Sequence, residues 1–238
     1  MSALDGRLAL VTGAGSGIGR ALALALARHG ARVCLTGRTA AKLEATARAL
    51  PEAGDRVRVL PADLTVDADL KRLAGEVSEL DILVLAAGEY ASGPFADVSA
   101  SDVDVLYRAN VRANYAIVRS FLPALRTRRG DIVFINSSTG LGARPEVGAF
   151  SATNHALKAL ADSLREELAG DGVRVLSVYP GRTATPRLEA MYARTGQVYR
   201  PELLLQPEDI AEAVLSALRL PDTAQVTDIS LRPLAKSY

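Results

Sequence analysis

The chain has one cysteine in 238 residues, no long apolar run and a formal net charge of only +1. Because a single thiol cannot form an internal disulfide, the composition is compatible with a reducing compartment. The N-terminal segment lacks the basic and apolar regions of a signal peptide, and no stretch is long enough to span a bilayer. The near-zero charge gives no electrostatic reason to bind nucleic acid or an anionic membrane. We therefore expect a soluble, cytoplasmic protein.

Metal and ATP sites are not expected either. The three side chains that favour soft metals, His29, Cys34 and His155, are not closely spaced, so no metal site is predicted. Cys34 lies within an apolar run and is interpreted as a small core residue. The chain has no G-x-x-x-x-G-K-[ST] sequence, which argues against an ATPase-type phosphate loop.

The rest of the chain is organised around a glycine-rich turn that reads Thr12-Gly13-Ala14-Gly15-Ser16-Gly17-Ile18-Gly19. A short apolar run precedes this turn and an alanine- and leucine-rich segment follows it, as in a strand–loop–helix unit. Glycines let the backbone approach a pyrophosphate closely, and a helix N-terminus offers free N–H groups with a positive dipole end. The turn therefore predicts a nucleotide site formed by Gly13, Gly15, Ser16, Gly17, Ile18 and Gly19, although a tight strand-to-helix connection would use similar residues.

Seven apolar runs alternate with amphipathic or alanine-rich segments along the whole chain. The expected strands centre on residues 8–11, 32–35, 57–60, 82–85, 131–136, 173–178 and 225–229. The expected helices lie near residues 18–29, 40–49, 67–78, 101–126, 150–169 and 207–219. Strict alternation with continuous apolar strands favours a parallel sheet covered on both faces. We predict one α/β, doubly wound domain over residues 1–238, with ligands at the carboxyl ends of its strands.

The ends of the second and third strands carry residues suited to a dinucleotide. Arg38 follows the second strand, where an NAD site usually has an acidic residue, and its charge suits the 2′-phosphate of NADP. A solvated loop arginine is the alternative. Asp63-Leu64 follows the third strand, where the carboxylate would accept the adenine amino group or cap the next helix.

The fourth and fifth strands also end in residues suited to a ligand. Ala86-Ala87-Gly88 leaves room at the end of the fourth strand, although a glycine there also simply turns the chain. Ser138 follows the fifth strand and is a candidate donor to a substrate oxygen, or alternatively a cap.

These motifs resemble the short-chain dehydrogenase/reductase family, and the resemblance covers nearly the whole chain. The family's T-G-x-x-x-G-x-G turn matches residues 12–19, and its N-A-G element is similar to Ala86-Ala87-Gly88. Its catalytic asparagine and serine match Asn110 and Ser138. Its Pro-Gly element matches Pro180-Gly181, and Thr183 follows where members often hold the nicotinamide carboxamide. The resemblance implies hydride transfer between a nicotinamide cofactor and a small-molecule carbonyl or alcohol, NADP(H) in preference to NAD(H) because of Arg38, and a homodimer or homotetramer.

The chain departs from the family pattern at the centre of the chemistry. The family's Tyr-x-x-x-Lys would fall on positions 150–154, which read Phe150-Ser151-Ala152-Thr153-Asn154. A spacing of four on a helix places both side chains on one face, toward one ligand. In the family the tyrosine donates a proton, while the lysine lowers its pKa and holds the nicotinamide ribose. Phe150 has no hydroxyl and Asn154 has no charge, so the usual proton donor is absent.

The altered motif leaves three hypotheses for function. The first is an NADP(H)-dependent short-chain oxidoreductase that is inactivated or uses an atypical proton route, with Tyr107, Tyr192, Tyr199 and His155 as substitute donors. The second is a non-catalytic NADP-binding scaffold or sensor. The third, ranked lowest, is an isomerase or cyclase that uses the same pocket. In each case a segment at about 184–205 is expected to form a small substrate lid, with a plain surface helix as the alternative.

Overall fold

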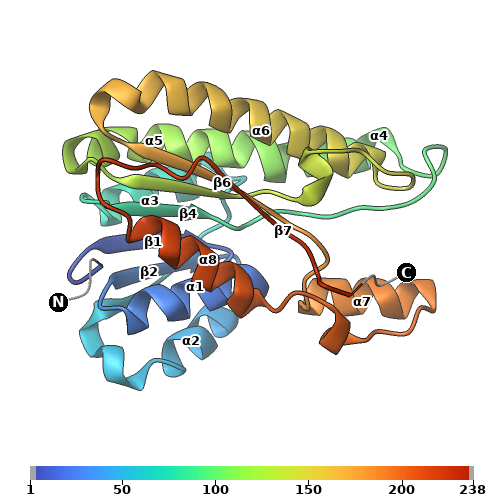
Figure 1. The fold of residues 1–238 in the computed structure, drawn as a ribbon, viewed down its shortest axis with the longest axis horizontal. Helices are drawn as coiled ribbons and strands as arrows, with labels where there is room; N and C mark the ends of the chain where they lie inside the picture. The colour runs from blue at the N-terminus through green and yellow to red at the C-terminus, as the bar shows by residue number, and fades with distance from the viewer. Residues whose placement is uncertain (1–3, 236–238) are drawn as a thin grey trace.

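The centre of the computed structural model, which describes residues 4–235, is a seven-stranded parallel sheet (Figure 1). The strands are β1 (Leu8–Thr12), β2 (Arg32–Gly37), β3 (Val57–Pro61), β4 (Ile82–Leu85), β5 (Asp131–Ile135), β6 (Arg174–Pro180) and β7 (Asp228–Leu231). They lie side by side in the order β3-β2-β1-β4-β5-β6-β7. The strand order therefore reverses between β1 and β4, which is where a doubly wound sheet binds its ligand. The predicted α/β domain is confirmed.

Helices cover both faces of this sheet. They are α1 (Gly17–Arg28), α2 (Ala40–Arg48), α3 (Asp67–Glu76), α4 (Ala100–Tyr107), α5 (Ala113–Arg128), α6 (Gly148–Leu168), α7 (Pro186–Thr195) and α8 (Pro207–Leu218). Figure 1 shows α1, α2 and α8 below the sheet, α5 and α6 above it, and α7 set apart beside the last strand. In residues 4–235 we find no helix with both the length and the apolar character needed to cross a membrane.

Alternate residues of the inner strands enter two separate cores. Ala9 and Val11 of β1 pack in the core that contains Leu22 of α1, whereas Leu8 and Leu10 pack in the core that contains Phe121 of α5. A strand that is buried on both faces has no exposed side for polar residues. This two-sided burial is the reason that the inner strands read as continuous apolar runs.

Two elements differ from the sequence predictions. The last strand, predicted at 225–229, is displaced to Asp228–Leu231, because this edge strand alternates exposed and half-buried residues and has no apolar run to mark it. The single helix predicted over 101–126 is instead α4 and α5, joined by a π-helical turn at Arg108–Arg112. Such turns interrupt regular helices frequently at functional sites.

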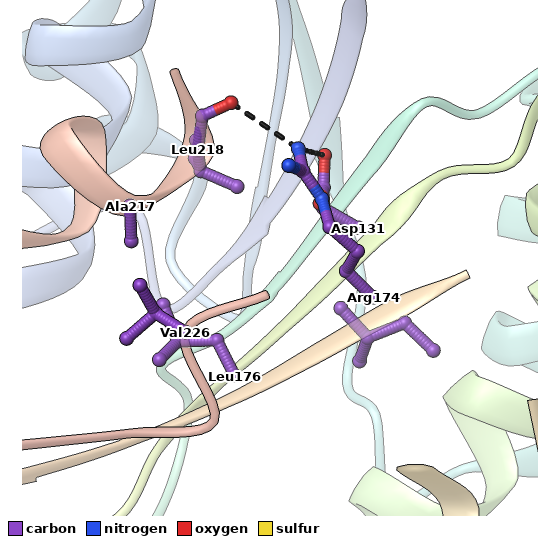
Figure 2. A pocket seen from close by; sticks show the side chains of 7 residues that line it. Asp131, Arg174, Leu176, Ala217, Leu218 and Val226 are labelled. Atoms are coloured by element: carbon purple, nitrogen blue, oxygen red, sulfur yellow. Dashed lines mark hydrogen bonds and ion pairs between the residues drawn. The ribbon is translucent and has the colours of Figure 1, made fainter. Parts of the chain in front are cut away.

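Two buried carboxylates, Asp81 and Asp131, lie at the amino-terminal edge of the sheet, opposite the predicted ligand edge. Asp131 accepts hydrogen bonds from Arg174 Nε and from Arg7 Nη2, each at 2.6 Å. Figure 2 shows Arg174 reaching from Asp131 toward the carbonyl of Leu218, beside a cavity of about 10 Å³. That volume is about one water molecule, so this cavity is a gap in the packing and not a substrate site.

Candidate functional site

The glycine turn packs so tightly that several of its positions have no room for a side chain. Gly13 has φ +65°, and an added Cβ would lie 2.9 Å from the carbonyl oxygen of Ala86. An added Cβ on Gly19 would collide with the Gly13 carbonyl oxygen, and one on Gly15 would lie 2.9 Å from Lys42 Cβ. The first turn of α1 therefore starts directly against the backbone that follows β1. This is the close approach that a phosphate cradle needs.

The N-terminus of α1 also keeps polar groups free for a ligand. Ser16 is the N-cap residue, but its side chain makes no capping hydrogen bond. Ile18 packs against the core, while Gly17 adopts φ +52°. An unused hydroxyl beside the free N–H groups of a helix N-terminus is suited to an anion.

Thr12 ties the glycine turn to the end of β4. Its Oγ1 accepts hydrogen bonds from the backbone N–H groups of Ala86 and Ala87, at 2.9 and 3.0 Å. The two strands that flank the switch point of the sheet are thereby held together at their carboxyl ends. The predicted cofactor residues of both strands lie at one edge.

Charged side chains from three elements meet beside this edge. Arg38 Nη2, after β2, lies 2.6 Å from Oε1 of Glu89, which follows β4. Arg187, in the first turn of α7, donates a hydrogen bond from Nη2 to the carbonyl of Gly88. Desolvation by surrounding groups lowers the pKa of Arg187, while the Glu89 carboxylate acts in the opposite direction. The cluster joins the end of β4 to both Arg38 and the α7 segment.

Asp63 caps a turn of its own chain. Its Oδ1 accepts from the N–H of Thr65 at 2.9 Å and from the Thr65 hydroxyl at 2.7 Å. The hydrogen bond from the Thr65 backbone is the main cause of the lowered pKa of Asp63. The residue thus stabilises the turn before α3, whose N-cap is Val66. The adjacent Leu64 is buried in the core.

Asn110 lies in the π-helical turn and grips the chain after β4. Its Oδ1 accepts from the Glu89 N–H at 2.7 Å, and its Nδ2 donates to the Glu89 carbonyl at 3.0 Å. The same Nδ2 reaches Thr153 Oγ1 of α6 at 3.3 Å. These hydrogen bonds require glycine at position 88, since an added Cβ there would lie 2.8 Å from Asn110 Oδ1. Asn110 therefore couples the β4 end to α6.

Ser138 begins a short 3₁₀ turn after β5, and the cationic side chain of Arg144 lies beside it. Its Oγ accepts a hydrogen bond from Arg144 Nη2 at 3.3 Å. A hydroxyl that accepts in this way keeps its own proton for another acceptor. Ser138 is thus able to donate to a substrate oxygen.

Phe150 and Asn154 lie one turn apart on α6, but the amide of Asn154 is turned back onto its own helix. Asn154 Nδ2 donates to the Phe150 carbonyl at 2.8 Å, and the residue is only 5% exposed. Its backbone carbonyl accepts from Asn136 Nδ2 at 3.0 Å. The Phe150 ring meets the ring of Tyr90 edge to face, with centroids 4.8 Å apart. Position 154 therefore presents no charge to a ligand, and its amide nitrogen is already bonded to its own helix.

Residues 184–205 form a projecting segment whose two ends are held together by backbone hydrogen bonds. Gly181 N–H donates to the carbonyl of Leu231 at 2.8 Å, which fixes Pro180-Gly181 against β7. Thr183 and Leu205 form an isolated parallel bridge, and Thr183 Oγ1 donates to the Gly181 carbonyl at 3.1 Å. The segment between these anchors contains α7. Its N-cap residue, Thr185, packs against Gly17 of the glycine turn.

The short chain dehydrogenase family model matches residues 7–195 of the chain. The chain belongs to the short-chain dehydrogenase/reductase family. An uncharacterized oxidoreductase of Staphylococcus aureus (strain MRSA252) is 36% identical over 239 residues, which cover 98% of this chain and 100% of that protein. The crystal structure of a metagenomic short-chain oxidoreductase with NADP is 32% identical, with a TM-score of 0.83 over 99% of this chain and 100% of the other. A variant of actinorhodin polyketide ketoreductase with NADPH gives a TM-score of 0.86 at 27% identity, over 97% of each chain.

In this short-chain dehydrogenase/reductase, the aromatic ring that contacts Phe150 belongs to none of the four predicted substitute donors. Tyr107 is 55% exposed on α4. The rings of Tyr192 and Tyr199 meet edge to face in the projecting segment, with centroids 5.7 Å apart. His155 Nδ1 is paired with the Ser151 carbonyl at 2.9 Å. The tyrosine against Phe150 is Tyr90.

Sequence reasoning missed three residues of the site: Glu89, Tyr90 and Arg144. Each lies in a loop at the carboxyl edge of the sheet, where no periodic pattern marks it. A signal was available for Glu89 and Tyr90, because they directly follow the Ala86-Ala87-Gly88 element. Arg144 had no such signal, since only the fold of its loop brings it to Ser138.

Proposed function

We propose that this short-chain dehydrogenase/reductase binds NADP(H) and transfers hydride between the nicotinamide and a small-molecule carbonyl or alcohol, without the family's usual tyrosine and lysine. The observation that carries the proposal is the glycine turn, in which an added Cβ on Gly13 or Gly19 would strike backbone atoms. A turn with no room for a side chain at these two positions, placed before the free N-terminus of α1, fits a pyrophosphate. When bound, the cofactor supplies or accepts the hydride.

The residues that would hold the cofactor share the carboxyl edge of the sheet. The glycine turn and Ser16 would bind the pyrophosphate, and Asp63-Leu64 would border the adenine. The other contacts would come from Ala86, Ala87, Gly88, Pro180, Gly181 and Thr183. Position 154, which is occupied by an amide bonded to its own helix, would leave the nicotinamide ribose without its usual cation. We therefore expect NADPH to bind, with modest affinity.

A preference for NADP(H) over NAD(H) rests on Arg38. Its side chain is 66% exposed after β2, within reach of a ligand, and its ion pair with Glu89 is open to solvent. A guanidinium binds a phosphate group through charge-assisted hydrogen bonds, and NAD lacks that phosphate. The Glu89 carboxylate reduces this preference, because it already neutralises part of the charge.

Ser138 and Asn110 would keep their catalytic positions. Ser138 would donate a hydrogen bond to the substrate oxygen while Arg144 donates to Ser138. Asn110 would hold the β4 loop against α6 and thereby shape the pocket. With Phe150 and Asn154 at the positions of the missing pair, the proton comes from another group. The 184–205 segment would close over the substrate as a lid.

A non-catalytic NADP-binding scaffold is the second candidate. The observation that favours it is the pairing of Asn154 Nδ2 with the Phe150 carbonyl, which leaves the centre of the usual acid pair with neither a hydroxyl nor a charge. Cofactor binding and hydride transfer are separate properties, so the glycine turn supports both candidates equally. Turnover decides between them.

We also propose a homodimer or homotetramer in the cytoplasm. Val103, Val105 and Tyr107 are 40%, 57% and 55% exposed on α4. Several large apolar groups exposed on one helix favour its burial against a second copy. The single cysteine, Cys34, is buried and free, which is compatible with a reducing compartment.

The deciding experiment compares the wild-type chain with the Phe150→Tyr/Asn154→Lys variant. NADPH oxidation is followed with a panel of ketones and aldehydes, and NADPH binding is followed separately by calorimetry. Measurable turnover by the wild-type chain supports the oxidoreductase. Turnover by the variant alone supports the scaffold. Absence of heat at millimolar NADPH would overturn both.

A further inference from the structure

We infer that the hydroxyl of Tyr90 is the proton donor that replaces the missing phenol at position 150. The inference rests on the proposed function, because it concerns carbonyl reduction at the same site. Its starting point is the contact between the rings of Tyr90 and Phe150, 4.8 Å apart and inclined by 68°. A phenol that packs edge to face on the Phe150 ring lies beside the place where the family's tyrosine ring would be.

The main chain on both sides of Tyr90 is held in place. Just before it, Asn110 makes two hydrogen bonds to the backbone of Glu89, at 2.7 and 3.0 Å. Three residues after it, the Gly93 N–H donates to the carbonyl of Glu146 at 2.7 Å. A proton donor must be held near its acceptor, so a fixed backbone is a requirement that a mobile loop would not meet.

The same anchors link the segment that carries Tyr90 to the loop that supports Ser138. The Asn110 amide that holds Glu89 also reaches Thr153, and the Thr153 hydroxyl donates to the Phe150 carbonyl at 2.8 Å. On the other side, the loop that carries Glu146 also carries Arg144, whose guanidinium donates to Ser138. The segment that carries Tyr90 is therefore tied both to the helix of Phe150 and to the loop that supports Ser138.

The chemistry balances with Tyr90 in this role. A bound nicotinamide would supply the hydride to the carbonyl carbon, and the π electron pair of the C=O bond would then move to oxygen. The O–H bond of Tyr90 breaks, and its proton forms the new O–H bond of the alcohol. The side chain is only half-buried, so the phenolate regains a proton from solvent. In the oxidation direction the same steps run in reverse.

The test is a set of tyrosine-to-phenylalanine substitutions, each of which removes only a hydroxyl. Tyr90→Phe keeps the ring contact with Phe150, so a purely structural role would survive it. Tyr115→Phe is the matched control, since Tyr115 is 56% exposed on α5. We expect Tyr90→Phe to lower kcat/KM by about 10²–10⁴-fold, measured with a ketone that the wild-type chain reduces. This is the usual contribution of a general acid. The control should change it less than twofold.

Both substitutions are then repeated in the Phe150→Tyr/Asn154→Lys variant. There the phenol introduced at position 150 can supply the proton, so Tyr90→Phe should cost less than about fivefold. A residue that only shapes the pocket would cost the same in both backgrounds. Equal losses in the two backgrounds would overturn the inference.

A second readout needs no turnover. The chain is labelled with 3-fluorotyrosine, and the resonance of position 90 is assigned as the one that Tyr90→Phe removes. Addition of NADP⁺ with acetophenone, an oxidised pair that cannot react, should shift this resonance by more than that of Tyr115. An unshifted resonance would overturn the inference even if the wild-type chain reduces ketones.

The outcomes separate this inference from the proposed function. If the wild-type chain reduces ketones and Tyr90→Phe matches the Tyr115→Phe control, only the inference fails. If the wild-type chain binds NADPH but reduces nothing, the proposed hydride transfer fails and Tyr90 with it. A large loss for Tyr90→Phe, rescued at position 150 and accompanied by the shifted resonance, supports both.

Discussion

Arg38 and Glu89 form an ion pair, with 2.6 Å between Nη2 and Oε1, that joins the end of β2 to the end of β4. The two residues are 51 positions apart in the chain. Their pairing places a carboxylate beside the group proposed to recognise the 2′-phosphate of NADP. A phosphate that binds Arg38 must therefore compete with a charge of its own sign.

Neutralising Glu89 should strengthen the preference for NADPH. In Glu89→Gln the Asn110 hydrogen bonds to the backbone remain, while the competing charge is gone. Solvent-exposed ion pairs contribute about 0.2–1 kcal/mol, so we expect the Kd for NADPH to fall by about 1.4- to fivefold and the Kd for NADH to change little. Arg38→Ala should have the opposite effect on NADPH. Calorimetric Kd values for both cofactors measure this.

A matched control is available at the other end of the same strand. Glu79 lies 4.0 Å from Arg32, which begins β2 at the amino edge of the sheet. Glu79→Gln removes the same charge far from the predicted phosphate, so both Kd values should stay unchanged. An equal effect of the two substitutions would mean that net charge, and not the position of Glu89, sets the preference.

The glycine turn should not tolerate a single methyl group at Gly19. An added Cβ would collide with the Gly13 carbonyl oxygen, so Gly19→Ala must move α1 or the turn. Overpacking of this kind costs about 1–3 kcal/mol, and a domain of this size loses roughly 2–4 °C in Tm per kcal/mol. We expect Tm to fall by the amount that this cost implies. The Kd for NADPH should rise at least about tenfold, because the glycine turn changes shape.

Gly75→Ala provides the comparison. Gly75 lies in α3, where an added Cβ meets nothing within 4 Å. Alanine is favoured over glycine inside a helix by about 0.5–1 kcal/mol, so this variant should be slightly more stable and bind NADPH normally. Thermal unfolding and calorimetry of both variants test the pair. Normal NADPH binding by Gly19→Ala would contradict the proposed cradle.

Asp131, one of the two buried carboxylates at the amino-terminal edge of the sheet, should affect the stability of the fold and not the binding of NADPH. Asp131 is only 4% exposed at its side chain and is bonded to both Arg7 and Arg174. Asp131→Asn leaves those guanidinium groups without their charge partner, which costs about 3–5 kcal/mol for a buried pair. The unfolding free energy in urea should fall by that amount, while the Kd for NADPH of the folded protein stays unchanged.

An exposed ion pair of equal length is the control for Asp131. Asp171 lies 2.6 Å from Arg126, but their side chains are 40% and 49% exposed. Water screens this pair, so Asp171→Asn should cost less than about 1 kcal/mol. Similar losses for the two variants would show that burial does not set the strength of these pairs.

The regular part of this fold was predictable because local pattern determines it. Strands buried on both faces must be apolar along their whole length, and the glycine turn has a spacing that few other structures need. The prediction of secondary structure was wrong where no repeating apolar pattern marks the element. β7 lies at an edge, so its sequence carries no apolar run, and the π-helical turn at Arg108–Arg112 has no pattern that distinguishes it from regular helix.

From the order of the elements alone, the candidate site could be predicted only near the ends of strands. Arg38, Asp63 and Ser138, which lie within three residues of the ends of β2, β3 and β5, were predicted for that reason, and their roles remain predictions. The contacts that give the site its chemistry join distant segments: Tyr90 to Phe150, Arg38 to Glu89, and Asn110 to Glu89. Loop conformation decides such contacts, and loop sequences do not encode them in a repeating pattern.

Arg144 should make Ser138 a better donor to the substrate. Its guanidinium donates to Ser138 Oγ at 3.3 Å, so the serine proton is directed to another acceptor. A hydrogen bond of this kind contributes about 1 kcal/mol, so Arg144→Ala should lower kcat/KM about fivefold. Arg119→Ala is the control, because Arg119 is also an exposed arginine but lies on α5.

A double-mutant cycle decides whether Arg144 acts through Ser138 or on the substrate directly. In the Ser138→Ala background the hydroxyl is gone, so Arg144→Ala should have almost no further effect on kcat/KM. If Arg144 instead binds an anionic group of the substrate, its loss will be the same with and without Ser138. In that case KM will rise for ketones that carry a carboxylate and stay constant for neutral ones, because only the charged substrates lose an ion pair.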